Sequence, residues 1–344
     1  MLTDYAGLGQ SWSEPTIATV KVGGVTKHVA IIGGGYSSDN SAGCALYVID
    51  VQDGTRLKHF TSTDHANLDK SIPSTVLAVD TTFDGYINRV YVGDLGGQMW
   101  RFGNQDPASS EDGEINNWTA RRLFASSLPS PKIFYPPDMV IEPGYTYLYF
   151  GTGDRTDPMS TTETNRFYAV KDKNESDTDF QNRVGVLTES HLVDLTDDLI
   201  QEGTAEEAED TYTALNAGDG WYIDMENAGE KVLAPPTVIF GMVLFTTFTP
   251  VDTVANPCSY GGDARLYVVD YLTAVSIIDW DEDTDLEKSD RSLHLGQGIP
   301  TEVVITITNT GAVRGYVGAG GGIIHWDFTS NASGFSIDSW REKF

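Results

Sequence analysis

A proline-led strand motif recurs along this chain and sets its architecture. In each copy a proline is followed within two residues by Ser, Thr or Asp and then by a run of strand-forming residues. The leading prolines are Pro15, Pro73, Pro136, Pro235 and Pro300. They lie 58, 63, 99 and 65 residues apart, so three of the four intervals define a unit of about 60 residues. A period of this length predicts one supersecondary unit that is copied along the chain, with an insertion in the long interval.

A second motif follows the first, and consists of a strand that contains tyrosine and ends in an acidic or glycine-containing turn. Its copies span residues 45–54, 89–97, 147–154, 166–172, 265–271 and 314–322. The alternation of side chains in these segments has the period of a strand. We therefore expect the proline motif to be the inner strand of each unit and the tyrosine motif a middle strand. Radially repeated sheets of this kind form propeller blades, which predicts an all-β, propeller-type fold over residues 1–344 as a single domain.

The long interval carries a predicted insertion at residues 174–230. Leu192, Leu195 and Leu199 hold helical spacing, and the charged segment 204–210 is rich in helix-forming residues. This pattern favours a helical or loop excursion on one face of the propeller. A solvated surface insertion without a function of its own is the simplest interpretation.

Residues 80–88 have the pattern of a cation-binding loop. Asp80, Thr82, Asp84 and Asn88 carry oxygen at alternating positions, and Gly85 follows the third of them. Alternate residues of a Ca²⁺ loop point inward, and glycine permits its sharp turn. The strand, turn and Trp-bearing strand that follow, residues 89–102, favour a loop within a blade over an EF-hand helix pair. A metal-free turn formed by the same aspartates and glycine is the alternative.

A second acidic run, at residues 279–287, alternates in the same way. Asp279, Asp281, Asp283 and Asp285 are followed by Glu287. No glycine occupies the sixth position, where the first loop has one, so we expect a solvated acidic loop. A weak second cation site is the alternative.

The charge of the chain restricts its partners and compartment. A formal net charge of −28 excludes nucleic acid as a partner, because affinity for phosphates comes from Lys and Arg. It also disfavours anionic membranes and is consistent with an extracellular protein that binds divalent cations. No signal peptide opens the chain, so we expect a mature form or a domain of something longer. We expect Cys44 and Cys258 not to be paired with each other.

Motifs for catalysis are missing from the sequence. The six histidines form no HExxH motif, and the chain has no GxSxG, P-loop or CxxC motif. The expected class is therefore a binding or scaffold protein and not an enzyme. Quinone-dependent dehydrogenases, propellers with Trp-bearing hairpins, are the enzyme alternative, but no adjacent cysteine pair is present here.

Several segments of the chain, in collinear order from Gly7 to Asp327, resemble the C-terminal domain of the PilY family of type IV pilus tip and biogenesis proteins. The most distinctive are GDLGGQMWRF at residues 93–102 and GWYID at residues 220–224. The resemblance implies a modified propeller of about seven blades. It also implies roles in pilus biogenesis, extension and retraction, twitching motility and surface adhesion.

The resemblance further implies one Ca²⁺ ion, with Asp80, Thr82, Asp84 and Asn88 as side-chain ligands and Tyr86 as a carbonyl ligand. Thr82 is a neutral hydroxyl where the family has an acid or an amide, and Asn88 is neutral where the family commonly has Asp. The lower charge predicts weak binding, with a Kd of roughly 10⁻⁴ to 10⁻³ M. Minor pilins of the tip complex, and a surface ligand, are the implied partners. The implied location is the cell surface at the pilus tip, or the outer membrane and periplasm. The large N-terminal adhesive region of the family is not in this sequence. A metal-free scaffold of the tip complex is the alternative function.

Overall fold

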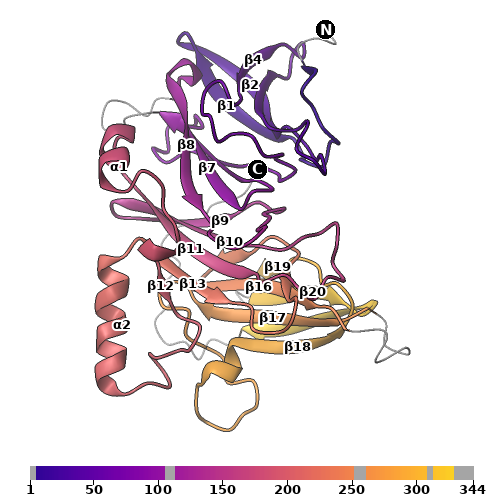
Figure 1. Ribbon diagram of the computed structural model, residues 1–344, viewed down its shortest axis with the longest axis vertical. Helices are drawn as coiled ribbons and strands as arrows, with labels where there is room; N and C mark the ends of the chain where they lie inside the picture. Colours follow the sequence, from indigo (N-terminus) through magenta and orange to yellow (C-terminus); the bar gives the residue numbers. More distant parts are fainter. Residues whose placement is uncertain (1–4, 105–112, 252–260, 308–312, 329–344) are drawn as a thin grey trace.

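The structure, a computed structural model, describes residues 5–104, 113–251, 261–307 and 313–328. In this part of the chain the strands form five sheets that follow one another in sequence order (Figure 1). All neighbouring strands are antiparallel except the short pair β12–β13. The predicted all-β, propeller-type class is confirmed.

The first three sheets contain four, four and five strands. The first holds β1 (Thr16–Val22), β2 (Val25–Gly33), β3 (Leu46–Asp50) and β4 (Arg56–Phe60). The second holds β5 (Leu77–Val79), β6 (Arg89–Gly93), β7 (Gln98–Asn104) and β8 (Trp118–Ala125). The third holds, from one edge to the other, β9 (Asp138–Glu142), β10 (Tyr145–Gly151), β11 (Arg166–Lys173), β13 (Gly220–Asp224) and β12 (Val193–Asp194).

The fourth sheet holds β16 (Met242–Thr249), β17 (Asp263–Asp270) and β18 (Ser292–Gln297), with β14 (Lys231–Val232) and β15 (Thr237–Ile239) both on the outer side of β16. The fifth holds β19 (Val304–Ile307), β20 (Val313–Ala319) and β21 (Gly322–Phe328). Every proline motif leads into an edge strand of its sheet, namely β1, β5, β9, β15 or β19. The tyrosine motifs form interior strands, as predicted.

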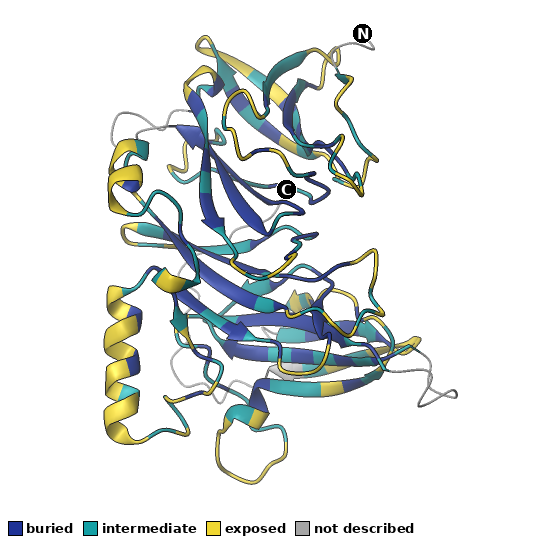
Figure 2. Ribbon diagram, in the orientation of Figure 1, coloured by how far each residue is buried: buried dark blue, intermediate teal, exposed yellow. Residues whose placement is uncertain are grey.

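Consecutive sheets pack face to face, and each pair encloses an apolar core. Val20 of the first sheet lies in one core with Trp100 of the second. Phe167 of the third sheet stacks on Phe245 of the fourth, with ring centroids 3.8 Å apart. Equivalent clusters join the second sheet to the third and the fourth to the fifth. Figure 2 shows this burial as dark blue strands through the middle of the molecule.

The residue directly after the last proline of the motif ties its blade to the next one. Proline fixes its own φ and donates no backbone hydrogen bond. The side chain of the residue that follows contacts the neighbouring inner strand. The bonds are Thr16 Oγ1 to the Val76 carbonyl (3.0 Å), Thr237 Oγ1 to the Val303 carbonyl (3.2 Å), and the Val238 N–H to Asp138 Oδ2 (2.8 Å). A hydrogen bond of this kind is therefore present at three of the four junctions between blades, which explains why the motif recurs.

The distinctive segment at residues 93–102 is a hairpin held by one buried carboxylate. Asp94 accepts hydrogen bonds from the backbone N–H groups of Gly96 (2.8 Å) and Gln98 (3.0 Å). It also accepts from Trp100 Nε1 at 2.7 Å. Complete burial raises the pKa of Asp94 to about 6, although these donors favour the charged form. The motif therefore fixes a turn between β6 and β7.

The number of blades differs from the prediction that rested on resemblance. About seven were implied, whereas the described residues form five sheets. The proline motif also occurs five times, and each copy leads into one sheet, so the internal repeat of this chain accounts for the observed number.

The predicted insertion at 174–230 is helical only in part. It contains α1 (Asp177–Arg183) and α2 (Ala205–Ala217), and α2 is largely exposed (Figure 2). Of the two forms expected around Leu192, Leu195 and Leu199, helix or loop, the structure has a largely irregular segment and no α-helix. A short 3₁₀ turn at Glu189–His191 and strand β12 lie there, because Val193 pairs with Trp221 of β13. Strand β13 belongs to the third sheet, so 174–230 is not purely an excursion from the blades.

Candidate functional site

The predicted cation loop at residues 80–88 connects β5 to β6 and packs against the first blade. The Ile87 N–H donates to the Thr19 carbonyl at 2.8 Å. The Tyr86 hydroxyl lies 3.0 Å from Thr26 Oγ1, and the Lys21 ammonium lies 4.3 Å from the centroid of the Tyr86 ring. The loop therefore lies at the junction between the first two blades.

Asp80 organises this loop through its carboxylate. Oδ1 accepts from the backbone N–H of Thr82 (3.1 Å) and of Phe83 (2.6 Å), and Oδ2 accepts from Gly85 N–H at 2.8 Å. Gly85 has φ of +88°, which glycine adopts without strain. The sharp turn that the sequence pattern predicted at Gly85 is present, and the loop folds around Asp80.

Three of the five predicted ligands are brought together. Thr82 Oγ1 lies 3.1 Å from Asp80 Oδ1 and 3.3 Å from Asn88 Nδ2. The Asn88 side-chain oxygen Oδ1 instead accepts from the backbone N–H of Thr81 at 3.0 Å. Asp84 is exposed, and its Oδ1 accepts from the Tyr86 N–H at 3.0 Å. Cation binding here would require the Asn88 amide to turn its oxygen inward and the Asp84 carboxylate to approach the other ligands.

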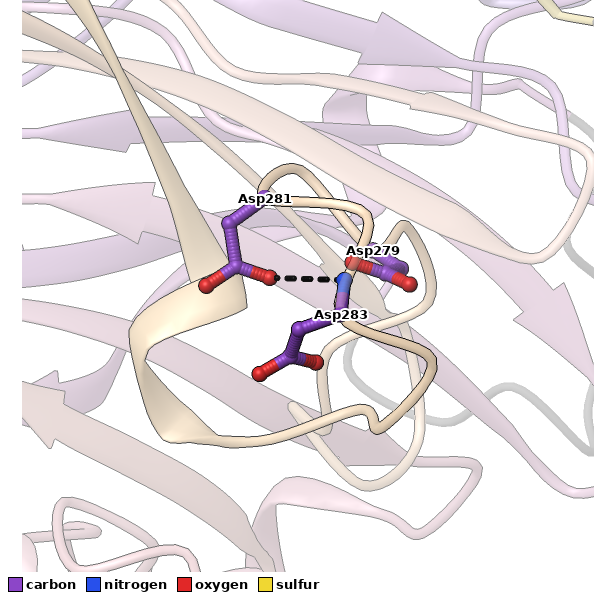
Figure 3. Close-up of side chains that lie close together, drawn as sticks. All are labelled: Asp279, Asp281 and Asp283. Atoms are coloured by element: carbon purple, nitrogen blue, oxygen red, sulfur yellow. Dashed lines mark hydrogen bonds between the residues drawn. The ribbon is translucent and has the colours of Figure 1, made fainter.

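The second acidic loop gathers its carboxylates more closely. One oxygen from each of Asp279, Asp281 and Asp283 lies within 4.8 Å of the others (Figure 3). Asp281 Oδ1 accepts from the Asp283 N–H at 3.3 Å. Desolvation and the neighbouring charges of Asp283 and Asp290 raise the pKa of Asp281 above its ordinary value. A cluster of this kind can stay solvated or hold a divalent cation.

The two loops have the same backbone conformation. Phe83 and Gly85 have φ of 61° and 88°, and the equivalent residues of the second loop, Glu282 and Thr284, have 60° and 87°. Asp279 also accepts from the N–H groups of residues 282 (2.7 Å) and 284 (3.0 Å). Asp80 accepts from the N–H groups at the equivalent positions, residues 83 and 85. The second run turns although it has no glycine at the sixth position, because Thr284 adopts the positive φ. The alternation of four aspartates was the signal that identified this loop.

Only one of the two cysteines lies in the described part of the chain. Among the described residues Cys44 has no disulfide partner, and its thiol lies 3.2 Å from the Asn40 carbonyl oxygen. Burial raises the pKa of this thiol. Cys258 lies outside the described residues, so the pairing of the two stays a prediction.

Sheets that follow one another in sequence, pack face to face and start with equivalent inner strands define a protein of the β-propeller class. No helix in the part of the chain that the structure describes combines the length and the apolar character needed to cross a membrane.

The chain belongs to the PilY1 β-propeller family, because the family model for the PilY1 beta-propeller domain matches residues 4–204. It is 28% identical over 307 residues to the type IV pilus biogenesis factor PilY1 of Pseudomonas aeruginosa strain PAO1, covering 77% of this chain and 26% of that protein. It is 26% identical over 299 residues to a PilY1 homologue of Xylella fastidiosa strain Temecula1, covering 76% and 19%. The chain thus spans about a quarter or less of the length of these relatives.

The crystal structure of the Pseudomonas aeruginosa PilY1 C-terminal domain has the same fold. The match has a TM-score of 0.64 at 20% identity and covers 94% of this chain and 73% of that domain. The family predicted from the sequence is therefore confirmed, and its relatives are type IV pilus biogenesis factors. What the domain binds is a separate question.

Proposed function

We propose that this chain is a calcium-binding propeller domain that supports type IV pilus biogenesis. In this proposal it acts in pilus extension and retraction, twitching motility and surface adhesion at the cell surface, through contacts with minor pilins and a surface ligand. It acts by binding and not by catalysis. Membership of the PilY1 β-propeller family supports the pilus role.

The observation that carries the calcium proposal is the conformation of residues 80–88. A Ca²⁺ loop needs oxygen ligands at alternating positions around a tight turn. Here the Thr82 hydroxyl lies within hydrogen-bonding distance of both the Asp80 carboxylate and the Asn88 side-chain amide. Turning the Asn88 amide would add its oxygen to this set.

A metal-free scaffold is the second candidate, and the same loop supports it. Three backbone N–H groups and one hydroxyl already satisfy the Asp80 carboxylate, so the turn does not require a cation to hold its shape. The two candidates differ in whether Ca²⁺ stabilises the folded protein.

The test is calorimetric titration of Ca²⁺ and thermal unfolding with and without Ca²⁺. With a Kd of roughly 10⁻⁴ M, 10 mM Ca²⁺ is a hundredfold excess and adds about 2.7 kcal/mol of stability. With a Kd of roughly 10⁻³ M, the gain is about 1.4 kcal/mol. Asp84→Asn should remove most of this gain, since it removes half of the formal charge of the loop while its amide oxygen still accepts from Tyr86.

Asp283→Asn is the matched control. Asp283 is the equivalent residue of the second loop, and its Oδ1 accepts from the Asp285 N–H at 3.0 Å, just as Asp84 accepts from Tyr86. The proposal requires Asp84→Asn to remove most of the calcium-dependent shift and Asp283→Asn to preserve it. Loss of the shift in Asp283→Asn alone would place the cation in the second loop and overturn the proposal. If Asp84→Asn leaves the shift intact, residues 80–88 form only a turn.

A further inference from the structure

The proline motifs line a groove that is separate from the sheet cores and from the proposed calcium loop. A hollow of about 340 Å³ is lined by residues from the starts of all five blades, among them Trp12, Pro73, Tyr135 and Pro235. A second hollow of about 400 Å³ shares Tyr135 and Pro235 with the first, so the two are continuous. The inner strands thus present their leading ends to one groove.

The walls of this groove are rigid. Its lining includes four prolines, each with a fixed φ, namely Pro73, Pro136, Pro235 and Pro300. The hydrogen bonds from Thr16 and Thr237 to the next blade hold the strands that carry the walls. At the first junction the Glu14 N–H also donates to Thr75 Oγ1 at 3.1 Å. A ligand would therefore meet a surface that loses little freedom on binding.

The surface of the groove is aromatic at one end. Trp12 stacks on Tyr36 with centroids 4.5 Å apart and planes 10° from parallel, and Phe134 lies 5.9 Å from Trp12. Trp12 keeps 39% of its surface exposed. Tyr135 accepts a hydrogen bond from Arg155 at 2.7 Å. Trp, Tyr and Arg dominate the binding energy of protein interfaces, and aromatic grooves receive extended polyproline II segments.

The charge of the groove favours a basic ligand. Glu14, from the first blade, and Glu302, from the fifth, contribute two carboxylates to the lining, and Arg155 contributes the only cation among the described lining residues. No ion pair joins either glutamate to another side chain in the described part of the chain. The protein as a whole has a formal charge of −28, which attracts cations toward such a groove.

We propose that this groove binds an extended, basic, proline-containing segment of a partner protein. Prolines of the segment pack on Trp12 and on the proline walls, and its Lys or Arg side chains pair with Glu14 and Glu302. The site is separate from the metal loop. The groove lies at the start of β1, whereas Lys21, which contacts Tyr86 of the metal loop, is near the end of that strand, about 17 Å away at the rise of a strand.

The test uses a fluorescein-labelled (Lys-Pro)₆ peptide and fluorescence anisotropy with the full chain. The double variant Glu14→Gln with Glu302→Gln should weaken binding about tenfold or more, since two charge pairs are lost. The control is Glu206→Gln with Glu209→Gln, two exposed residues of α2, which makes the same change in net charge. The control should change binding by less than about threefold, the effect of diffuse attraction alone.

Substitutions of Trp12 distinguish specific docking from nonspecific electrostatic attraction. Trp12→Ala should also weaken (Lys-Pro)₆ binding about tenfold, while Trp12→Phe should retain most of it. The unlabelled competitor (Lys-Gly)₆ should compete much more weakly than (Lys-Pro)₆, because it lacks the preformed extended conformation. Circular dichroism of each variant checks that the fold is retained.

Three results would overturn the proposal. The first is equal weakening by the Glu206/Glu209 control, and the second is equal competition by the glycine peptide. The third is Trp12-dependent binding of neutral oligosaccharides with no binding of the basic peptide. None of these results would affect the calcium proposal, which concerns the other end of β1.

Discussion

A buried ionic cluster at the junction of the second and third blades gives the sharpest stability prediction. Asp172 of β11 is fully buried, and its carboxylate lies 3.5 Å from Arg101, 3.5 Å from Arg121 and 3.8 Å from Arg89. The Tyr91 hydroxyl donates to it at 2.7 Å. We predict that Asp172→Asn, which keeps the shape and the tyrosine bond, destabilises the fold by about 3–5 kcal/mol at pH 7, the usual cost of breaking a buried ion pair.

The magnitude follows from these distances. At an effective dielectric constant of about 20, one pair of charges 3.5 Å apart attracts by about 5 kcal/mol, and repulsion among the three guanidinium groups and desolvation offset part of the total. Arg121 keeps a second acid, since its Nη2 lies 2.5 Å from Asp177 Oδ1. The loss should therefore fall within the range for one broken pair and not reach the sum of three.

The pH dependence has a defined sign. Burial opposes ionisation of Asp172, but Arg101, Arg89 and Arg121 outweigh it and hold the pKa of Asp172 below its ordinary value. A lowered pKa means that this stabilisation is complete above the unfolded pKa of about 3.9 and is lost as pH falls through the folded pKa. The difference in the free energy of unfolding between wild type and Asp172→Asn should thus be constant from about pH 5 to 8 and shrink below about pH 4.

Urea unfolding followed by circular dichroism measures this difference. The control is Asp197→Asn, whose side chain is 84% exposed and lies 3.8 Å from Lys288, and which should cost less than about 0.5 kcal/mol. A cost below about 1 kcal/mol for Asp172→Asn, or a difference that grows toward acid pH, would refute the assignment of this carboxylate as the partner of the three arginines.

Two further predictions concern the blade junctions and the loop backbones. Thr16→Val and Thr237→Val each remove a hydroxyl that bonds a carbonyl of the next blade, and each should cost about 1 kcal/mol in urea unfolding; no loss in either variant would contradict the role given to the motif. Thr284→Gly should stabilise the metal-free protein by about 0.5–1 kcal/mol, because a β-branched residue is strained at φ of 87°, and Gly85→Ala should destabilise it by about 1–2 kcal/mol; thermal unfolding that shows the opposite signs would refute the strain argument.

Repetition made the blade architecture predictable from sequence. Each proline motif leads into an edge strand of a sheet and each tyrosine motif lies inside one, because strand period and proline geometry are local properties. The resemblance implied about seven blades, whereas the five copies of the motif match the five described sheets. The repeat in the chain therefore predicts the number of sheets in the described residues.

Tertiary contacts decided the features that the sequence pattern missed. Leu192 and Leu195 have helical spacing, yet both are buried and flank strand β12. The pairing of β12 with Trp221 of β13 overrides the local preference for a helix. Thr284 lacks the freedom of glycine, yet the hydrogen bonds of Asp279 hold the same turn. The direction of the Asn88 amide depends on its bond from Thr81, which residue spacing does not specify.

The proposed metal loop is connected to both junctions of the second blade. Asn88, the last proposed ligand, is fully buried and directly precedes Arg89, whose guanidinium lies 3.8 Å from Asp172 of the third blade. Ile87 bonds the first blade through Thr19. A cation that clamped residues 80–88 would therefore restrain a segment that touches both neighbours of the second blade. In this arrangement calcium would act on two packed interfaces, which a surface turn remote from them could not do.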